Sequence, residues 1–302
     1  MGEDPEILVI GAGPAGLTAA TYLARFRRRV LVADGGASRA RWIPVSHNMP
    51  GFPQGITGDA ILKRMTEQAL EYGAIIEAGR VESLARDGNG FVAWLNDREV
   101  RVRAVLLAAG VIDQYPDLLG VERAIERSLV RICPICDGYE AIDKAVAVIG
   151  EDEKGVHEAA FLRTYTDRVT LIHTGPAEAL SAAGELERLG IELIWAPIDH
   201  VQLEGDRVTA LNWDGAFRTF DLVYSAFGTS ANATLAESLN ARTGEDGRLV
   251  VDDHQQTSID GLYAAGDVVR GLNQIAVASA EAAVAATAIH NALREADGWT
   301  VS

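Results

Sequence analysis

The sequence predicts an α/β fold of two Rossmann-like three-layer domains, one inserted into the other. Three observations lead to this prediction. An apolar strand runs into a glycine loop of dinucleotide spacing at residues 11–16 (Gly-Ala-Gly-Pro-Ala-Gly), and a second apolar strand runs into a related loop at residues 150–155. The two cysteines of the chain lie between these loops, as Cys133-Pro134-Ile135-Cys136. Each loop opens a helical pattern, which indicates a parallel β-loop-α-β unit with a right-handed crossover.

The N-terminal part alternates short apolar runs with helical patterns. Residues 45–58 are rich in Pro and Gly and are expected to form a loop. Strands are expected at 7–10, 30–33, 74–78, 80–85, 91–95, 99–103 and 105–110, and helices at 15–26 and 59–72.

The second half repeats this pattern, which indicates an internal duplication at the scale of a domain. Strands are expected at 145–150, 169–173, 191–195 and 222–228, and helices at 155–165 and 177–189. An apolar strand before Gly266 and an Ala-rich helix at about 274–294 are expected to return to the first domain. The domains are therefore placed at 1–112 with 246–302, and at 117–243 for the insert.

Composition excludes several classes of function. The 302 residues are 48% hydrophobic and 23% charged, which is typical of a globular chain with a full core. The net charge of -16 opposes binding to the phosphates of nucleic acids. The first residues are acidic, unlike a signal peptide, and no apolar run approaches the roughly 18 to 20 residues that span a bilayer. We therefore expect a cytoplasmic protein without membrane contact.

The spacing of the two cysteines favours redox chemistry over a structural role. Zinc needs about four ligands, but there is no second C-x-x-C and the six His residues show no ligand spacing, so no metal is expected. Two unpaired buried thiols are the alternative interpretation. Asp137 follows Cys136 directly, and its carboxylate opposes a low thiol pKa. Its expected use is proton transfer to a departing thiolate.

The first glycine loop is the stronger of two cofactor signals. Glycines at Gly11, Gly13 and Gly16 permit a tight turn and let the backbone approach a pyrophosphate at a helix N-terminus. Asp34 follows about 20 residues later, where a ribose hydroxyl needs an acceptor. Asp267 lies between a strand and a helix, where it would bind cofactor hydroxyls or act as an N-cap.

Four motifs in this order resemble the low-molecular-weight thioredoxin reductases and their relatives. They are residues 11–16, 48–53 (Asn-Met-Pro-Gly-Phe-Pro), 133–137 (Cys-Pro-Ile-Cys-Asp) and 265–268 (Ala-Gly-Asp-Val). Each motif alone is loose, but together they cover nearly the whole chain. The resemblance implies a homodimer, whose subunits have an FAD domain and an inserted pyridine-nucleotide-type domain that carries the C-x-x-C pair.

The resemblance also implies roles for individual residues. Cys136 would lie nearer the flavin, Cys133 would exchange with the partner disulfide, and Asp137 would be the acid/base. The partner would be a thioredoxin-like protein or a small disulfide. The residues that would bind FAD are Gly11, Gly13, Gly16, Asp34, Asn48, Gly266, Asp267 and Gln274.

The second glycine loop differs from that of the NADPH-using relatives, whose sequence at this place resembles Gly-Gly-Gly-Asn-Thr-Ala. Asp152 replaces the second fingerprint glycine and lies between two further acidic residues. A side chain there blocks the approach of a backbone, and its charge repels pyrophosphate. In those relatives the next strand continues His-Arg-Arg, whereas here His173 is followed by Thr-Gly-Pro. These changes disfavour NADPH.

The resemblance therefore shifts toward relatives that do not use pyridine nucleotides. Their electrons come from ferredoxin, from another flavoprotein, or from a second FAD in the vacated nucleotide site. Asn273 replaces an arginine that is usual before Gln274 in the NADPH enzymes, which also separates this chain from them.

The hypothesis is thus an FAD-dependent dithiol/disulfide oxidoreductase that does not use NADPH. An ordinary NADPH-thioredoxin reductase and an oxygen-dependent dithiol oxidase are the alternatives. Such oxidases more often carry His after the second cysteine, so Asp137 weighs against them. A non-catalytic flavoprotein that binds a partner through its acidic surface is a third interpretation, which the retained C-x-x-C-Asp motif disfavours.

Overall fold

The chain forms two compact units in the computed structural model, which describes residues 4–115, 121–176, 180–195, 201–204, 207–211 and 218–300. Unit 1 comprises Met1–Ile112 and Ser230–Ser302, and unit 2 comprises Asp113–Thr229. The segments that connect them, β8 (Val111–Asp113) and β17 (Thr229–Ala231), pair as a two-stranded sheet. Each unit contains a five-stranded parallel sheet, so the predicted α/β fold with two Rossmann-like sheets is confirmed.

Unit 1 is built on the parallel sheet β18-β7-β1-β2-β3, with a smaller antiparallel sheet β4-β5-β6. Its elements are β1 (Ile7–Ile10), α1 (Pro14–Arg25), β2 (Val30–Asp34), the 3-10 helix η1 (Arg39–Trp42), α2 (Gly58–Glu71), β3 (Ile75–Ala78), β4 (Val81–Asp87), β5 (Gly90–Leu95), β6 (Arg98–Val102), β7 (Ala104–Leu107), α7 (Thr234–Glu237), β18 (Leu262–Ala264) and α8 (Ile275–Ala296).

The alternation of side chains along β1 produces the layers of unit 1. Ile7 and Val9 pack into a core with α1 and α8, whereas Leu8 and Ile10 pack into a second core with the sheet β4-β5-β6. Because successive side chains of a strand point to opposite faces, a fully apolar strand must be covered on both sides.

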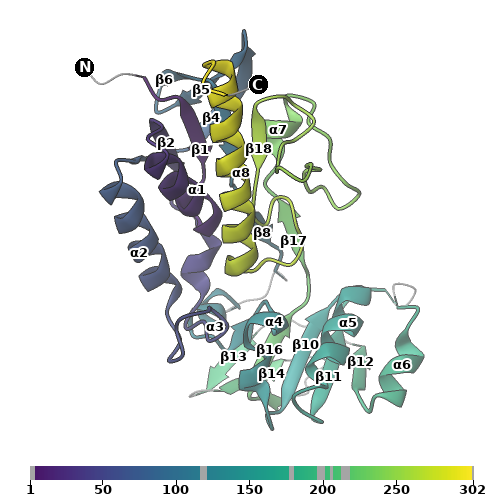
Figure 1. Cartoon of the computed structure of the whole chain (residues 1–302). Helices are drawn as coiled ribbons and strands as arrows, with labels where there is room; N and C mark the ends of the chain where they lie inside the picture. Colours follow the sequence, from purple (N-terminus) through teal and green to yellow (C-terminus); the bar gives the residue numbers. More distant parts are fainter. Residues whose placement is uncertain are drawn as a thin grey trace. The chain divides into compact units, whose positions relative to one another are not determined.

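Helix α8 is the one helix among the described residues whose length and composition would allow it to cross a membrane. Its small side chains instead pack against α1 in the core of unit 1 (Figure 1). Ala278, Ala282, Ala285 and Ala286 are buried there, and Ile289 is fully buried. The apolar character of α8 is therefore explained by helix packing.

Unit 2 repeats the plan with the parallel sheet β12-β11-β10-β16-β9. One of its cores lies with α5 and α6, and the other with α3 and the antiparallel strands β13-β14-β15. Its elements are α3 (Val121–Glu126), β9 (Val130–Arg131), α4 (Pro134–Asp137), the 3-10 helix η2 (Gly138–Ala141), β10 (Val146–Gly150), α5 (Glu153–Leu162), β11 (Val169–His173), α6 (Ala183–Arg188), β12 (Glu192–Trp195), β13 (Val201–Glu204), β14 (Arg207–Leu211), β15 (Thr219–Phe220) and β16 (Leu222–Ser225).

Two expectations about boundaries need correction. Residues 230–243 were assigned to the insert, but they belong to unit 1, because Ala233, Ala236 and Ala241 are buried in its second core. The helix expected at 177–189 starts only at Ala183 in the described part of the chain, and residues 177–179 lie outside it. The Glu153 carboxylate accepts the N–H groups of residues 181 and 182, so these groups take no part in a helical turn.

A buried ion pair joins the beginning and the end of unit 1. The Arg28 guanidinium contacts Glu6 at 3.0 Å and Asp297 at 3.1 Å, and the Arg28 and Glu6 side chains are only 5% and 9% exposed. Removing one partner of a buried pair leaves an uncompensated charge. We expect Arg28→Met to lower the free energy of unfolding of unit 1 by about 3 to 5 kcal/mol, measured by urea denaturation.

Arg29→Met is the matched control. Arg29 also pairs with Glu6, at 3.6 Å, but its side chain is 49% exposed. An exposed pair contributes about 0 to 1 kcal/mol, so the control should change little. Equal losses of unfolding free energy in the two variants would show that burial does not increase the contribution of the Arg28 ion pair to stability.

Candidate functional site

The first glycine loop joins β1 to α1 and leaves the start of that helix open. Gly11 has φ +111°, and a Cβ on it would clash with the Ala108 carbonyl oxygen. A Cβ on Gly16 would clash with the carbonyl oxygen of Gly11. By contrast, a Cβ on Gly13 would meet only the Ser38 hydroxyl, at 3.5 Å. Gly11 and Gly16 thus serve the packing of the loop, while Gly13 leaves room for a ligand.

A second helix N-terminus meets the first one at Gly266. This glycine has φ +84°, and a Cβ on it would lie 3.1 Å from the Ala15 Cβ and 3.5 Å from the Ala278 Cβ. The N-cap residues of α1 and α8, Gly13 and Gln274, make no side-chain capping hydrogen bond. Both helices therefore present N–H groups without side-chain caps, which favour an anion.

Glu281 holds the Gly266 turn, a role that sequence analysis missed. Its Oε2 accepts the Gly266 N–H at 2.9 Å, and its Oε1 accepts from Arg270 Nε at 2.7 Å. The residue is 6% exposed within the Ala-rich α8. A lone carboxylate on an apolar helix face was the signal that could have identified it.

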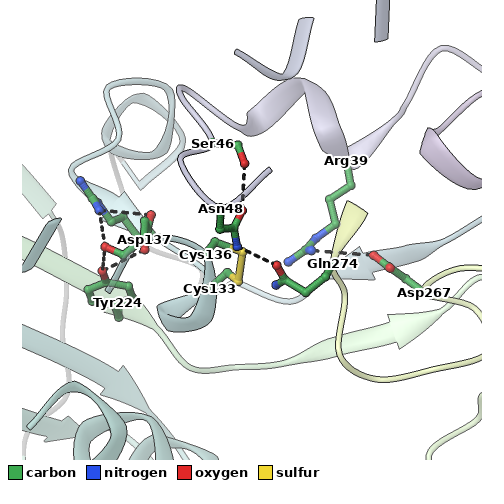
Figure 2. Close-up of a disulfide and its surroundings, with 10 residues drawn as sticks. Arg39, Ser46, Asn48, Cys133, Cys136, Asp137, Tyr224, Asp267 and Gln274 are labelled. Carbon is green, nitrogen blue, oxygen red and sulfur yellow. Dashed lines mark hydrogen bonds and ion pairs between the residues drawn. A yellow bond between two sulfur atoms is a disulfide. The ribbon is translucent and has the colours of Figure 1, made fainter. Parts of the chain in front are cut away.

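The side chains of Asn48, Asp267 and Gln274, all predicted to bind FAD, have polar partners within unit 1 (Figure 2). Asn48 Nδ2 donates to Gln274 Oε1 at 2.9 Å, and Ser46 donates to Asn48 Oδ1 at 2.9 Å. Asp267 pairs with Arg39 at 3.9 Å. Asn48 and Gln274 were predicted, whereas Ser46 and Arg39 were not.

Asp34 ends β2 and forms a local turn. Its Oδ1 accepts the Gly36 N–H at 2.9 Å, so one carboxylate oxygen stabilises the loop that follows the strand. The position at the carboxyl end of a parallel strand is the one that the fold uses for a ribose hydroxyl.

Unit 1 fits an FAD by its own geometry. The loop over Gly13 is open, and two helix N-termini that lack side-chain caps converge near it. Asn273 Oδ1, next to Gln274, is buried and finds no hydrogen-bond partner among the described residues. Buried polar atoms are normally paired, so this acceptor fits a donor on a bound molecule. The residues present therefore suit a flavin dinucleotide.

The redox pair lies on the short helix α4 of unit 2. Cys133 is its N-cap, and Pro134 at the first position pre-sets the helical backbone. The Cys136 N–H donates to the Cys133 carbonyl at 2.9 Å, and the two side chains form a disulfide. Among the described residues there is no group of three or more His, Cys, Asp and Glu that could hold a metal ion.

Asp137 is held by two residues that sequence analysis did not single out. Tyr224 OH donates to Asp137 Oδ1 at 2.9 Å, and Arg131 Nη1 lies 3.2 Å from Asp137 Oδ2 (Figure 2). Burial raises the pKa of Asp137, while Arg131 and Tyr224 oppose that rise. Burial also raises the pKa of Tyr224, so its hydroxyl stays protonated. In the sequence, the signal for this role of Tyr224 was a tyrosine inside the run Leu-Val-Tyr-Ser at residues 222–225, where a buried hydroxyl needs a partner.

In the second glycine loop, a carboxylate of the chain itself lies at the start of the following helix. Asp152 is the N-cap of α5, and its Oδ1 accepts the Lys154 N–H at 2.8 Å. The Lys154 ammonium pairs with the same carboxylate at 3.0 Å, and a Cβ on Gly228 would meet the Lys154 side chain at 3.3 Å. The start of α5 is therefore capped, unlike the start of α1.

The turn after β11 packs onto this loop. The Thr174 N–H donates to the Gly150 carbonyl at 2.9 Å, and a Cβ on Gly175 would clash with the Glu151 carbonyl oxygen. His173 is 1% exposed, with its Nε2 3.1 Å from the Pro176 carbonyl oxygen. The short Thr-Gly-Pro turn thus lies against the backbone of the loop.

Glu158 on α5 is a half-buried acid whose Oε2 is buried and has no hydrogen-bond partner among the described residues. Burial raises its pKa to about 8, and the nearby Asp152 charge adds to the effect. The residue therefore remains protonated across the acid and neutral range.

Two dinucleotide-type α/β units with a C-x-x-C disulfide in the second define a flavoprotein disulfide oxidoreductase. The family described as pyridine nucleotide-disulphide oxidoreductase matches residues 5–282, so the chain belongs to that family. It is a thioredoxin reductase-like enzyme with a redox-active disulfide and FAD as its implied cofactor.

Similar proteins cover nearly the whole length of the chain. The thioredoxin reductase of Mycolicibacterium smegmatis is 30% identical over 93% of this chain and 94% of its own length. The crystal structure of HlmI matches 98% of this chain and 94% of its own at 28% identity, with a TM-score of 0.91. The thioredoxin reductase structure from Streptococcus pyogenes MGAS5005 matches 96% and 98% at 26% identity, with a TM-score of 0.87.

Glu158 makes the stability of unit 2 depend on pH. The unfolded chain releases this proton near its ordinary pKa of about 4.3, whereas the folded chain keeps it up to about 8, so stability falls as the pH rises between these values. We expect Glu158→Gln to unfold like the wild type at about pH 4 and to be more stable by about 2 to 4 kcal/mol at about pH 8. Urea denaturation at both pH values measures the difference.

Glu187→Gln provides the control, because Glu187 is exposed on α6. Its effect should be small and the same at both pH values. A Glu158→Gln advantage that does not grow with pH would contradict the assignment of a protonated Glu158.

Proposed function

We propose that this enzyme is an FAD-dependent dithiol/disulfide oxidoreductase that does not take electrons from NADPH. The bound FAD would supply the two-electron redox chemistry, while the protein positions the dithiol and the proton donor. The observation that carries the proposal is the Asp152 carboxylate at the N-terminus of α5.

In a Rossmann unit the pyrophosphate of a dinucleotide binds the free N–H groups at a helix N-terminus. In unit 2 the Asp152 carboxylate already accepts one of these N–H groups, and Glu151 and Glu153 add negative charge beside it. Two unit charges about 4 Å apart repel by about 1 kcal/mol in water and by about 4 kcal/mol near a protein surface. Lys154 pairs with Asp152 and offsets one of these three negative charges, so the loop keeps a net negative charge. A helix N-terminus contributes about 1 kcal/mol to anion binding, so the remaining repulsion outweighs this attraction at the protein surface.

The same reasoning applies to a second FAD, because its pyrophosphate would need the same N–H groups. A single flavin per subunit, bound in unit 1, is therefore part of the proposal. The electron donor is then a protein such as ferredoxin or another flavoprotein.

The expected roles of the site residues make a balanced exchange. When a partner dithiol is oxidised, one of its thiolates attacks the Cys133 sulfur, a new S–S bond forms there, and the Cys133–Cys136 bond breaks with its electron pair on the Cys136 sulfur. The second partner thiolate then displaces Cys133 and closes the partner disulfide, and reduction of a partner disulfide is the reverse of these steps. Asp137, the next residue after Cys136, gives its proton to that sulfur. Cys136 would be the sulfur that exchanges electrons with a bound flavin.

The proposed partner is a thioredoxin-like protein. The curated relatives are named thioredoxin reductase and align over nearly their full length, which supports this class of disulfide over a small molecule. The homodimer implied by the family resemblance belongs to the same proposal.

An anaerobic titration tests the electron donor. We expect dithiothreitol to bleach the flavin of the wild type but not that of Cys136→Ser, and NADPH to leave both unchanged. Rapid bleaching by NADPH would overturn the proposal and identify an ordinary NADPH-thioredoxin reductase. Two flavins per subunit would contradict the single-flavin part, and peroxide formation during dithiol consumption would identify a dithiol oxidase.

Removal of the cap tests the physical reason. We expect Asp152→Gly to increase the affinity of the protein for NADPH by about tenfold, measured by calorimetry, because the N–H groups of α5 become free. Asp152→Asn is the matched control, since the amide oxygen still caps the helix while the charge is gone. It should gain less than Asp152→Gly. No gain in either variant would show that the carboxylate does not govern nucleotide binding.

A further inference from the structure

The Tyr224 hydroxyl lies between two acceptors of the same residue. It is 2.9 Å from Asp137 Oδ1 and 3.2 Å from the Asp137 backbone carbonyl oxygen. Tyr224 comes from β16 and is 0% exposed, so its ring is fixed by the core of unit 2. The hydroxyl hydrogen is the only part of this side chain that can turn freely.

Two acceptors let one hydroxyl serve both protonation states of Asp137. A tyrosine hydroxyl carries one proton to donate and also has lone pairs to accept. When Asp137 is ionised, the hydroxyl donates to Oδ1. When Oδ1 carries a proton, the hydroxyl donates to the backbone carbonyl instead and so keeps a partner while the carboxyl proton stays free to be given away. A buried polar atom left without a partner is costly, and this arrangement avoids that cost in either state.

Arg131 fixes the other side of the same residue. Its Nη1 lies 3.2 Å from Asp137 Oδ2 and donates to the Asp137 carbonyl oxygen at 3.1 Å, while its Nε donates to the Ser128 carbonyl oxygen at 3.3 Å. The Arg131 and Asp137 side chains are 14% and 21% exposed, so this ion pair is largely shielded from water. The carboxyl group therefore keeps one orientation, with Oδ1 toward Tyr224.

We propose that Tyr224 is a positioning residue that lets Asp137 take up and release a proton without moving, and that Arg131 holds the carboxyl group for it. This inference deepens the proposed function and rests on it. As a dithiol thiolate bonds to the Cys133 sulfur and the Cys133–Cys136 bond breaks, the electron pair stays on the Cys136 sulfur, the Asp137 proton moves to that sulfur, and the Tyr224 hydroxyl turns back to the vacated Oδ1.

The ionisable groups around Asp137 come from three neighbouring elements and from α5. Arg131 on β9, Tyr224 on β16 and Glu140 on η2 act on its carboxyl group, and Glu140 raises its pKa. Helix α5, which packs against α4, carries the ionisable residues Glu153, Lys154, His157 and Glu158.

The test measures the rate at which dithiothreitol breaks the Cys133–Cys136 bond in the full-length protein. Quenched alkylation and mass spectrometry follow the bond from about pH 5 to about pH 9, with each rate corrected for the thiolate fraction of dithiothreitol. The corrected rate should fall on the alkaline side as Asp137 loses its proton. In Tyr224→Phe the midpoint of this fall should move up by about one pH unit, because a hydrogen bond that favours the carboxylate is lost.

Ser225→Ala is the matched control. Ser225 is the next residue on β16, is 4% exposed, and its hydroxyl has no hydrogen-bond partner among the described residues. Losing this buried hydroxyl should leave the midpoint unchanged. Arg131→Gln should raise the midpoint as Tyr224→Phe does, because it removes the cation, whereas Arg131→Lys should raise it less.

Asp137→Asn separates this inference from the proposed function. If Asp137 is the proton donor, this variant should lose the alkaline fall and react about a hundredfold more slowly. An Asp137→Asn variant with wild-type rate and midpoint would overturn the role of Asp137 itself. The other informative outcome concerns the inference alone. If Asp137→Asn loses the alkaline fall in rate, but Tyr224→Phe and Arg131→Gln keep the wild-type midpoint of that fall, then Asp137 is the proton donor and the roles of Tyr224 and Arg131 are overturned.

Discussion

The free N–H groups at the start of a helix that follows a parallel strand govern what each unit can hold. A strand-loop-helix connection places these groups at the carboxyl edge of the sheet, and they must find an acceptor in the protein, in water or in a ligand. In unit 1, α1 begins without a side-chain cap and Gly13 leaves open space above it. In unit 2, Asp152 supplies the acceptor from within the chain. The two loops thus differ in whether the chain itself caps the helix that follows.

Burial determines which acids of unit 2 keep their protons. Desolvation raises the pKa of both Asp137 and Glu158, but their surroundings differ. Asp137 has a cation and a hydroxyl beside it, which keep the ionised form accessible. Glu158 has the Asp152 charge beside it, which disfavours ionisation further. The first arrangement suits an acid that must give up its proton, and the second suits one that retains it.

The sequence predicted the parts of the fold that depend on local pattern. The two glycine loops, the apolar strands after which they lie and the C-x-x-C pair all appear at their predicted positions. What sequence analysis missed depends on contacts between distant segments. The bond between Tyr224 and Asp137 joins residues 87 apart, and no spacing rule connects them. The late start of α6 has the same kind of cause, since Glu153 binds the N–H groups that would have begun the helix.

The order of the strands in unit 1 has a consequence for synthesis. The edge strand β18 pairs with β7, with Leu262 beside Val105, and α8 completes the core against α1. Both late elements follow the whole of unit 2 in the chain. On the ribosome, unit 2 is therefore fully synthesised while unit 1 still exposes the β7 edge and the apolar side of α1. Unpaired strand edges and exposed apolar surface favour aggregation, so nascent unit 1 is exposed to it until the last segment of the chain has been made.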